Sequence, residues 1–198
     1  MRCAESGWRQ VASGMRSGLF LDDGNFMNVH PFDLLALPQK GAGLLLTPCP
    51  GTRGVEAGQS LDQLKAAGAS ALITLMPKAE MLRNGVADLD EWCAERGLSW
   101  FHLPIEDERA PADDFRKAWK VQRTTVHELL DAGRVIAIHC KGGPGRTGLM
   151  AAQILVERGA TKEQASAAVR SLRPNALQLP VHQDYLAGLT VSESRQPG

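Results

Sequence analysis

The residues best suited to chemistry stand together in the stretch HCKGGPGRTG, which covers positions 139–148. Cys140 carries a nucleophilic sulfur, and Arg146 carries a planar cation that can hold two oxygens of a phosphate group at once. Thr147 adds a hydroxyl that could stabilise a departing thiolate. His139 is expected to orient the loop through a hydrogen bond, because neighbouring residues of a strand point to opposite faces. The pattern therefore suits attack of a cysteine thiolate on phosphorus.

The glycines of this stretch predict a phosphate-binding loop. A glycine-rich turn between a strand and a helix directs several backbone N–H groups at one anion, and the helix dipole adds positive potential. The same groups, together with Arg146, favour the ionised form of the Cys140 thiol. Pro144 has no N–H, and losing one hydrogen bond to a charged ligand costs roughly 1.5 to 3 kcal/mol, so we expect weakened phosphate binding or slowed turnover. The expected phosphate-binding residues are Lys141, Gly142, Gly143, Gly145 and Arg146.

A proton donor for the leaving group is expected in the acidic stretch Glu106, Asp107 and Glu108. This stretch lies between an expected strand and an expected helix, where a loop can approach a bound substrate. The residue types alone leave the choice among the three carboxylates open. Asp113 and Asp114 are weaker candidates, because acidic side chains are common in the first turn of a helix.

The elements that must position these residues alternate along the chain. The continuous apolar run before Cys140 predicts a central strand that is buried on both faces. Short apolar runs and amphipathic segments take turns on either side of it. The expected strands cover 44–47, 71–75, 98–103 and 134–139. The expected helices cover 60–68, 77–83, 87–96, 115–130, 149–158 and 161–172, with an interruption at Asn84 and Gly85. Ser60 is expected to cap the first of these helices, and Thr161 and Gln164 form a capping-box pattern at the start of the last. This alternation predicts an α/β fold with a central, mostly parallel sheet flanked by helices.

Composition limits the alternatives. The chain has 198 residues, of which 43% are hydrophobic, enough for one sizeable core. We expect an N-terminal arm at 1–40, weakly structured or packed on the core, one catalytic domain at 41–190 and a tail at 191–198. The 22 basic and 22 acidic side chains balance, which argues against nucleic acid or an anionic membrane as a partner of the whole surface.

The four cysteines predict neither a disulfide framework nor a metal site. Cys3, Cys49, Cys93 and Cys140 form no C-x-x-C pair and have no histidine at a zinc-site spacing. The sequence shows neither a signal-peptide pattern nor a membrane-spanning run, so we expect a cytoplasmic protein without membrane insertion. Cys93 is expected in the core. An oxidised Cys140 could pair with Cys49 or Cys93 if their Cα atoms lie close enough.

The motifs also carry a family resemblance. HCKGGPGRT resembles the Cys-x5-Arg-Ser/Thr signature of cysteine-dependent protein phosphatases of the dual-specificity type. FHLPIEDERAP is similar to the general-acid loop of that class, above all in the cyclin-dependent kinase inhibitor 3 (kinase-associated phosphatase) subgroup. SLRPNALQLPVHQDYL resembles the closing segment of the same subgroup. The resemblance extends from about Leu44 to Tyr185 and implies a phosphotyrosine-phosphatase-like fold.

The resemblance implies a reaction in two steps without a metal or cofactor. Cys140 attacks phosphorus while Asp107 protonates the leaving group, and water then releases phosphate with Asp107 as base. The resemblance thus selects Asp107 among the three carboxylates. It also assigns Gln178 and Gln183 to recurrent glutamines near the active site, where Gln178 either orients the hydrolytic water or caps the last helix.

The expected substrate is a phosphorylated protein, with phosphotyrosine first and phosphoserine or phosphothreonine as further targets. Lys141 favours an alternative substrate, a phosphoinositide or another small phosphate ester. Pro144 favours an alternative of another class, a pseudophosphatase that binds phosphorylated partners without turnover. The spacing G-x-G-x-x-G at 143–148 also fits a dinucleotide-binding loop, but the segment after Gly159 is helical in pattern, whereas that fold requires a second strand ending in an acid.

Overall fold

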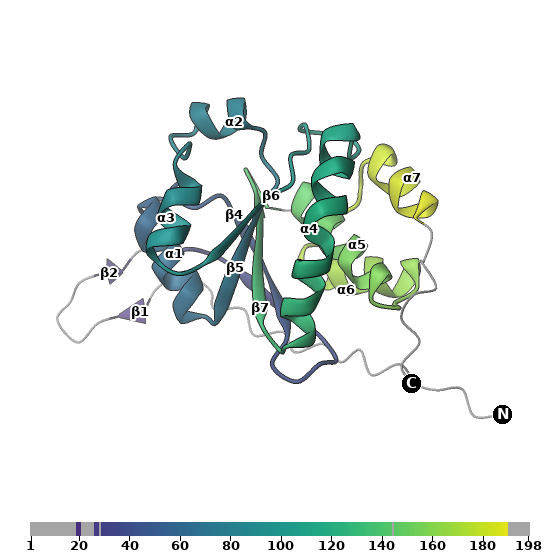
Figure 1. Ribbon diagram of the computed structural model, residues 1–198, viewed down its shortest axis with the longest axis horizontal. Coiled ribbons are helices and arrows are strands. Elements are labelled where there is room, and N and C mark those ends of the chain that lie inside the picture. The colour runs from purple at the N-terminus through teal and green to yellow at the C-terminus, as the bar shows by residue number, and fades with distance from the viewer. Residues whose placement is uncertain (1–18, 21–25, 28, 144, 190–198) are drawn as a thin grey trace.

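The computed structural model describes residues 19–20, 26–27, 29–143 and 145–189. Figure 1 shows its main body, one sheet between two layers of helices. The expectations for Pro144 and for the tail 191–198 lie outside the described residues, as does most of the expected N-terminal arm.

The sheet has five strands in the order β3-β4-β7-β5-β6. The first of these is antiparallel to its neighbour, and the remaining four are parallel, which confirms the predicted mostly parallel α/β architecture. The strands are β3 (Asp33–Ala36), β4 (Gly43–Pro48), β5 (Ala69–Thr74), β6 (Ser99–His102) and β7 (Val135–Cys140). A separate antiparallel pair is formed by β1 (Leu19–Phe20) and β2 (Phe26–Met27).

Helices cover both faces of the sheet (Figure 1). Neighbouring strand residues point to opposite faces, so Leu45 and Ala137 pack toward one helical layer, and Leu44 and Ile136 toward the other. The first layer contains α1 (Ala57–Ala66), α2 (Lys78–Arg83) and α3 (Leu89–Glu95). The second contains α4 (Asp113–Asp131), α5 (Arg146–Glu157), α6 (Lys162–Leu172) and α7 (Pro180–Gly188).

Several expected boundaries differ from the observed ones. Strand β3 lies within 1–40, so the sheet extends into the segment expected as an arm. Helix α1 begins at Ala57, and the hydroxyl of Ser60, expected as the cap, is buried and donates to the Val55 carbonyl at 3.4 Å. The capping box of Thr161 and Gln164 is confirmed. Helix α5 begins at Arg146, three residues before the expected start, and this brings the arginine into the first helical turn.

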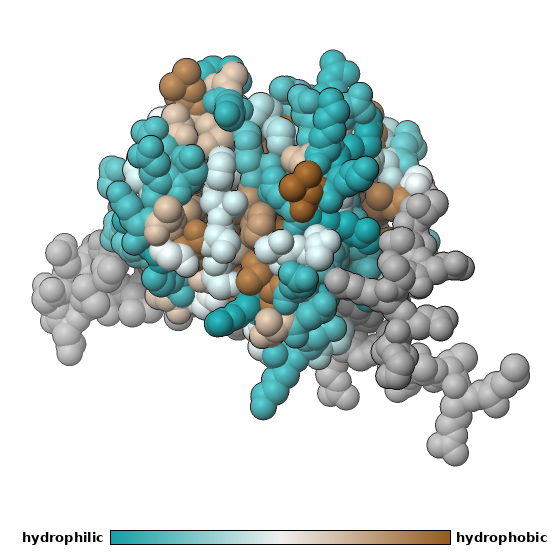
Figure 2. All heavy atoms as spheres, in the orientation of Figure 1, coloured by the Kyte–Doolittle hydropathy of each residue, from teal (hydrophilic) through white to brown (hydrophobic). Residues whose placement is uncertain are grey.

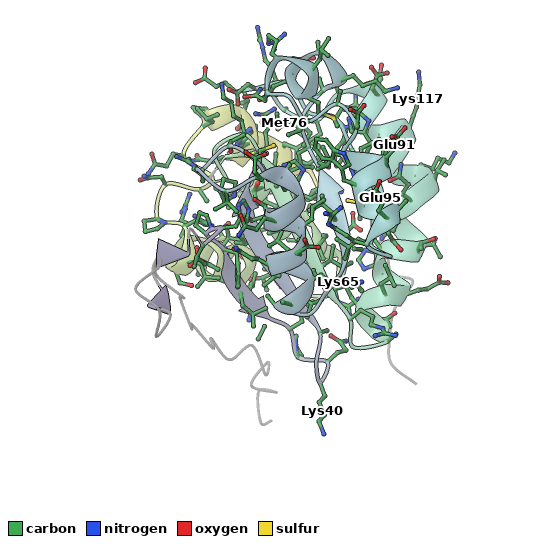
Figure 3. The ribbon with its side chains drawn as sticks, turned by 90° about the vertical axis from the view of Figure 1, so that its left-hand side faces the viewer. Lys40, Lys65, Met76, Glu91, Glu95 and Lys117 are labelled. Carbon is green, nitrogen blue, oxygen red and sulfur yellow. The ribbon has the colours of Figure 1, made fainter. Side chains whose placement is uncertain are left out.

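The two ends of the sheet differ in what they expose. The parallel strands end at the same edge, where Met76 lies, whereas Lys40 projects from the opposite end at the turn between β3 and β4 (Figure 3). On the face shown in Figure 2, hydrophilic side chains cover most of both helical layers. No helix in the described ranges is both long and apolar enough to cross a membrane.

Candidate active site

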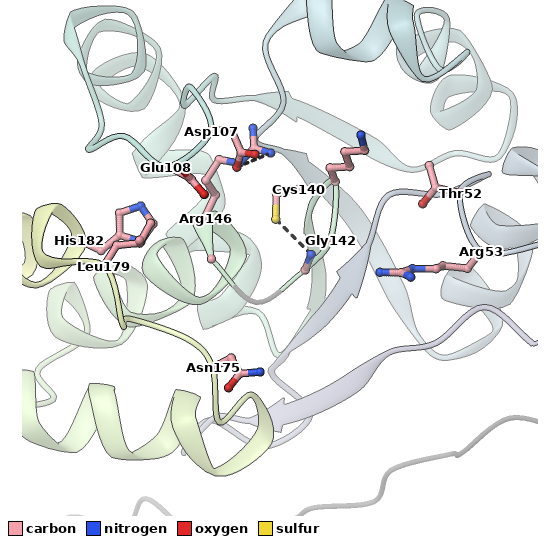
Figure 4. A pocket seen from close by; sticks show the side chains of 13 residues that line it. Thr52, Arg53, Asp107, Glu108, Cys140, Gly142, Arg146, Asn175, Leu179 and His182 are labelled. Carbon is pink, nitrogen blue, oxygen red and sulfur yellow. Dashed lines mark hydrogen bonds and ion pairs between the residues drawn. The ribbon is translucent and has the colours of Figure 1, made fainter.

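The expected nucleophile lies at the carboxyl end of the central strand. Cys140 is the last residue of β7, which pairs with β4 on one side and β5 on the other. Its side chain is buried, yet it lines a cavity of about 500 Å³ at the carboxyl edge of the sheet (Figure 4). Helix α5 starts six residues later, and the described residues of the loop between strand and helix line this cavity. This is the strand-to-helix arrangement that the sequence predicted.

Gly143 fixes the shape of the loop below the sulfur. Its φ of 98° lies in the left-handed region that favours glycine. A Cβ at this position would stand 3.3 Å from the Pro48 nitrogen and 3.4 Å from the Thr47 carbonyl oxygen, which leaves little room for any side chain. The Gly143 N–H donates to Cys140 Sγ at 3.2 Å. The loop thus directs a backbone donor at the sulfur, and a donor to sulfur stabilises the thiolate.

Arg146 reaches the same cavity from the first turn of α5, and its side chain is almost fully buried. Its Nη1 donates to Glu80 Oε2 at 2.6 Å and to the Ile105 carbonyl at 3.0 Å, and its Nη2 donates to Glu80 Oε1 at 2.9 Å. Burial disfavours the cation, but Glu80, Cys140 and Asp107 outweigh that cost and hold the pKa of Arg146 above its ordinary value. The guanidinium is therefore charged and fixed in orientation before a substrate arrives.

Asp107 approaches Arg146 from the loop between β6 and α4. Its Oδ1 lies 3.2 Å from Arg146 Nη2, and its side chain is 71% exposed (Figure 4). Asp107 and Glu108 both line the cavity, whereas Glu106 lines a neighbouring depression with Glu80. Of the three carboxylates left open by residue type, Asp107 is the one paired with the arginine.

Thr147 and His139 lie on either side of the nucleophile along the chain, and both are buried. The Thr147 hydroxyl has no hydrogen-bond partner among the described residues, so it is free to donate to a ligand or to the sulfur. His139 Nε2 lies 2.8 Å from Thr74 Oγ1, and burial lowers the pKa of His139 to about 3. His139 is therefore neutral near pH 7 and is held to β5 by this contact.

The remaining loop residues also reach the cavity. Lys141, Gly142, Gly143 and Gly145 line it together with Cys140. Lys141 is exposed, and its carbonyl accepts a hydrogen bond from Cys49 N at 3.2 Å, which ties the loop to the residue that follows β4. In the described part of the chain, no group of three histidine, cysteine or acidic side chains has an arrangement fit to hold a metal ion.

The two glutamines of the closing segment are directed elsewhere. Gln178 Nε2 donates to the Pro174 carbonyl at 3.4 Å, and Gln183 Nε2 donates to the Leu177 carbonyl at 2.9 Å. Neither glutamine is among the residues that line the cavity. Both amides stabilise the turn before α7, because the backbone carbonyls of that turn need donors. The cavity-lining residues of this segment are Asn175, Leu179 and His182.

Sequence reasoning missed three residues that shape the site. Glu80 holds the arginine from α2, His182 closes one wall of the cavity from α7, and Arg53 lines the opposite wall from the loop before α1 (Figure 4). These residues lie far from the loop in sequence, and no motif marks them. The nearest signal is the resemblance of the closing segment. It indicates the right part of the chain, but it selects Gln178 and Gln183 rather than His182.

Comparison with known proteins supports the resemblance given by the motifs. Over 128 residues the chain is 27% identical to cyclin-dependent kinase inhibitor 3 of Rattus norvegicus, a match that covers 63% of this chain. The chain spans 59% of that curated relative's length. These values support the predicted subgroup.

Solved structures give the same result. The crystal structure of kinase-associated phosphatase with its catalytic-site cysteine replaced by serine matches with a TM-score of 0.63 and 25% identity, over 73% of this chain and 83% of that one. Tk-PTP in its active form matches with a TM-score of 0.56 and 26% identity, over 77% of this chain and 96% of that one. The predicted dual-specificity phosphatase fold is therefore confirmed.

A family model shows to which family the chain belongs. The model described as "Polymorphic toxin system, DSP-PTPase phosphatase" matches residues 51–160, more than half of the chain. The matched span contains Asp107, Cys140 and Arg146, the three residues that meet at the cavity. The chain belongs to this family of DSP-PTPase phosphatases of polymorphic toxin systems.

Proposed function

We propose that this chain hydrolyses phosphate monoesters of proteins through a phosphocysteine intermediate, with phosphotyrosine as the first substrate and phosphoserine or phosphothreonine as further ones. One observation carries the proposal. Cys140 Sγ, which accepts from Gly143 N–H, shares a single cavity with the Arg146 guanidinium and the Asp107 carboxylate. A nucleophile, a cation for the phosphate oxygens and an acid are the groups that this reaction needs.

In the first step, Cys140 Sγ forms a bond to phosphorus while the bond from phosphorus to the ester oxygen breaks. Arg146 and the loop N–H groups bind the three remaining oxygens as charge develops on them. Asp107 gives its proton to the departing oxygen, so that the product leaves as a neutral alcohol or phenol.

In the second step, water replaces the leaving group. Asp107, now ionised, takes a proton from that water as its oxygen bonds to phosphorus and the P–S bond breaks. The sulfur leaves as a thiolate, which accepts hydrogen bonds from Gly143 N–H and from the unpartnered hydroxyl of Thr147. Inorganic phosphate is then released.

The decisive experiment compares release of phosphate from para-nitrophenyl phosphate by the wild type and by Cys140→Ser. We expect steady turnover by the wild type and background release by the variant, together with a phosphorylated Cys140 in acid-quenched wild type by mass spectrometry. Cys93→Ala is the matched control, because Cys93 is buried in α3, away from the cavity, and its loss should leave turnover in place. Equal release by wild type and Cys140→Ser, with retained binding of a phosphopeptide, would instead identify a phospho-binding pseudophosphatase.

A second candidate substrate is a small phosphate ester with a further anionic group, such as a phosphoinositide. Arg53 and Lys141 both line the cavity, and both are exposed. Arg53 makes no hydrogen bond or ion pair with the described residues, so its charge is available to a second anion. A panel containing a phosphotyrosine peptide and a short-chain phosphoinositide separates the two substrates. If the phosphoinositide is preferred, Arg53→Gln should reduce that preference while leaving the peptide rate in place.

A further inference from the structure

The turn that carries Asp107 has a strained backbone. Arg109 N donates to the Glu106 carbonyl at 3.2 Å, which closes a tight turn over residues 106–109. Glu108, the third residue of this turn, has a φ of 57°, in the left-handed region that residues other than glycine rarely adopt. Such a conformation persists only where neighbouring contacts hold it. The turn therefore needs support from the rest of the fold.

His182 on α7 supplies one such contact. Its Nε2 lies 3.0 Å from the Arg109 carbonyl oxygen, directly after the strained residue. A carbonyl oxygen only accepts, so Nε2 carries the hydrogen and donates it. The side chain is buried, and burial is the main cause that lowers the pKa of His182. Arg146 lowers it further, while the bond to Arg109 and the charge of Asp107 oppose the shift. His182 is thus a neutral, fixed donor near pH 7.

Helix α7 offers His182 a rigid base. Pro180 begins the helix with a backbone angle already suited to it. Tyr185 donates from its hydroxyl to Gln153 Oε1 at 2.9 Å, and Gln153 Nε2 donates to Glu157 Oε1 at 2.9 Å. Gln153 and Glu157 belong to α5, the helix whose first residue is Arg146. The helix that holds the turn is therefore fixed to the helix that holds the phosphate-binding arginine.

The turn is held from both sides. Before Glu108, Asp107 Oδ1 contacts Arg146 Nη2 at 3.2 Å, and after it, the Arg109 carbonyl accepts from His182. A bound phosphate competes with Asp107 for Arg146, so the contact to His182 is the one that persists when substrate is present. We propose that His182 is a positioning residue, which holds the turn 106–109 so that Asp107 reaches the leaving group. This inference rests on the proposed function, in which Asp107 is the general acid.

The experiment uses the dependence of rate on the leaving group. Dinitrophenyl phosphate has a leaving group that departs without a proton, whereas phenyl phosphate needs one. If His182 acts through Asp107, His182→Leu should lower kcat/KM for phenyl phosphate by about tenfold or more and that for dinitrophenyl phosphate by less than about twofold. In an Asp107→Asn background, His182→Leu should have no further effect on phenyl phosphate, because the acid is already absent.

Two variants separate positioning from general structural support. His182→Gln should restore most of the phenyl phosphate rate, since the glutamine amide nitrogen stands as many bonds from the backbone as Nε2 and can donate to Arg109. His102→Leu is the matched control. His102 Nε2 lies 2.8 Å from the Met76 carbonyl oxygen, but His102 does not line the cavity. Its loss should therefore change kcat/KM for both substrates by the same factor. His182→Met is a second variant without a donor, in case the leucine variant does not fold.

The outcomes separate the two proposals. Equal loss for both substrates in His182→Leu, while Asp107→Asn affects mainly phenyl phosphate, would overturn the role of His182 and leave the proposed function in place. If Asp107→Asn itself slows both substrates equally, the assignment of the acid is wrong, and the role of His182 falls with it.

Discussion

Glu80 and Arg146 form a buried, two-point ion pair that joins α2 to the first turn of α5, with N–O distances of 2.6 and 2.9 Å. Glu80→Gln removes the negative charge and leaves the buried arginine cation with only the exposed Asp107 as an anionic partner. Breaking a buried pair costs about 3 to 5 kcal/mol. Inorganic phosphate supplies the missing charge. We therefore expect urea unfolding to show a loss of stability in Glu80→Gln and a larger stabilisation by phosphate than in the wild type.

Glu91→Gln is the control for this measurement, because Glu91 lies on the outer surface of α3 (Figure 3). It should leave both stability and the phosphate effect unchanged. Equal stabilisation of wild type and Glu80→Gln by phosphate would mean that Glu80 does not set the charge balance at Arg146.

The choice of acid is tested by two conservative substitutions. Asp107→Asn should lower kcat for para-nitrophenyl phosphate by about 10²-fold, since general acid catalysis typically contributes that much or more. Glu106→Gln should change kcat little, because Glu106 does not line the cavity that holds Cys140. Steady-state kinetics of both variants gives the comparison, and similar losses in the two would place the acid on the wrong residue.

Oxidation should inactivate the enzyme reversibly. Hydrogen peroxide converts the Cys140 thiolate to a sulfenic acid with release of hydroxide, which takes up a proton to give water. Cys49 directly follows Pro48, which is paired in register with Cys140 across β4 and β7. Burial raises the pKa of Cys49 to about 12, so its attack on the sulfenic acid, which forms a disulfide and releases water, should be slow.

The measurement is recovery of activity by dithiothreitol after graded exposure to peroxide. At low peroxide, where slow attack by Cys49 still precedes further oxidation, Cys49→Ala should recover less than the wild type, because its sulfenic acid proceeds to the irreversible sulfinic acid. Cys93→Ala should recover like the wild type, since Cys93 lies on α3, in the core between the helices and the sheet. Identical recovery of the three proteins would exclude Cys49 as the partner.

Stability should fall as the solution becomes acidic. Burial lowers the pKa of His139 to about 3 and that of His30 to about 4. Between these values and the ordinary value of about 6.5, the unfolded chain binds protons that the folded chain does not. The contribution of the two neutral histidines to the free energy of unfolding is complete above about pH 6.5. Below that pH, each histidine lowers the free energy of unfolding by about 1.4 kcal/mol per pH unit, down to its own pKa.

Denaturant unfolding at pH 7.5, 6 and 5 checks this slope. His30→Gln removes one of the two titrations, so its stability should decline less steeply with acid than that of the wild type. A free energy of unfolding that stays constant from pH 7.5 to 5 would contradict the assignment of two buried neutral histidines.

Much of the fold follows from local pattern. The apolar run of β7, the glycine-rich loop and the capping box at Thr161 each report on their own neighbourhood, and all three are present as expected. Strand β3 was missed because it is a short edge strand between prolines and glycines, where turn signals dominate. No local pattern marks His127, which is buried on α4 with its Nε2 2.8 Å from Glu157 Oε2 of α5.

The candidate site likewise contains some residues that local pattern predicts and others that it does not. Residues joined by the motif, such as Cys140 and Arg146, meet where the motif predicts. Glu80 and His182 could not be found in this way, because their roles depend on which helices pack beside the loop. Helical periodicity predicts which face of a helix is buried, but it does not predict the partner of that face. Long-range packing therefore supplied what the sequence pattern lacked.

The position of β7 has a consequence for motion. Its backbone is bonded to β4 and β5 on both sides, whereas the turn 106–109 lies outside the sheet and is held through the contacts of Asp107 and Arg109. Amide hydrogen exchange in β7 should therefore require opening of the whole domain, while the turn exchanges through local opening. Cys140 and Asp107 thus lie in parts of the fold that open in different ways, the strand with the whole domain and the turn on its own. The phosphate site around Cys140 can then stay rigid while closure of the turn 106–109 limits the rate of turnover.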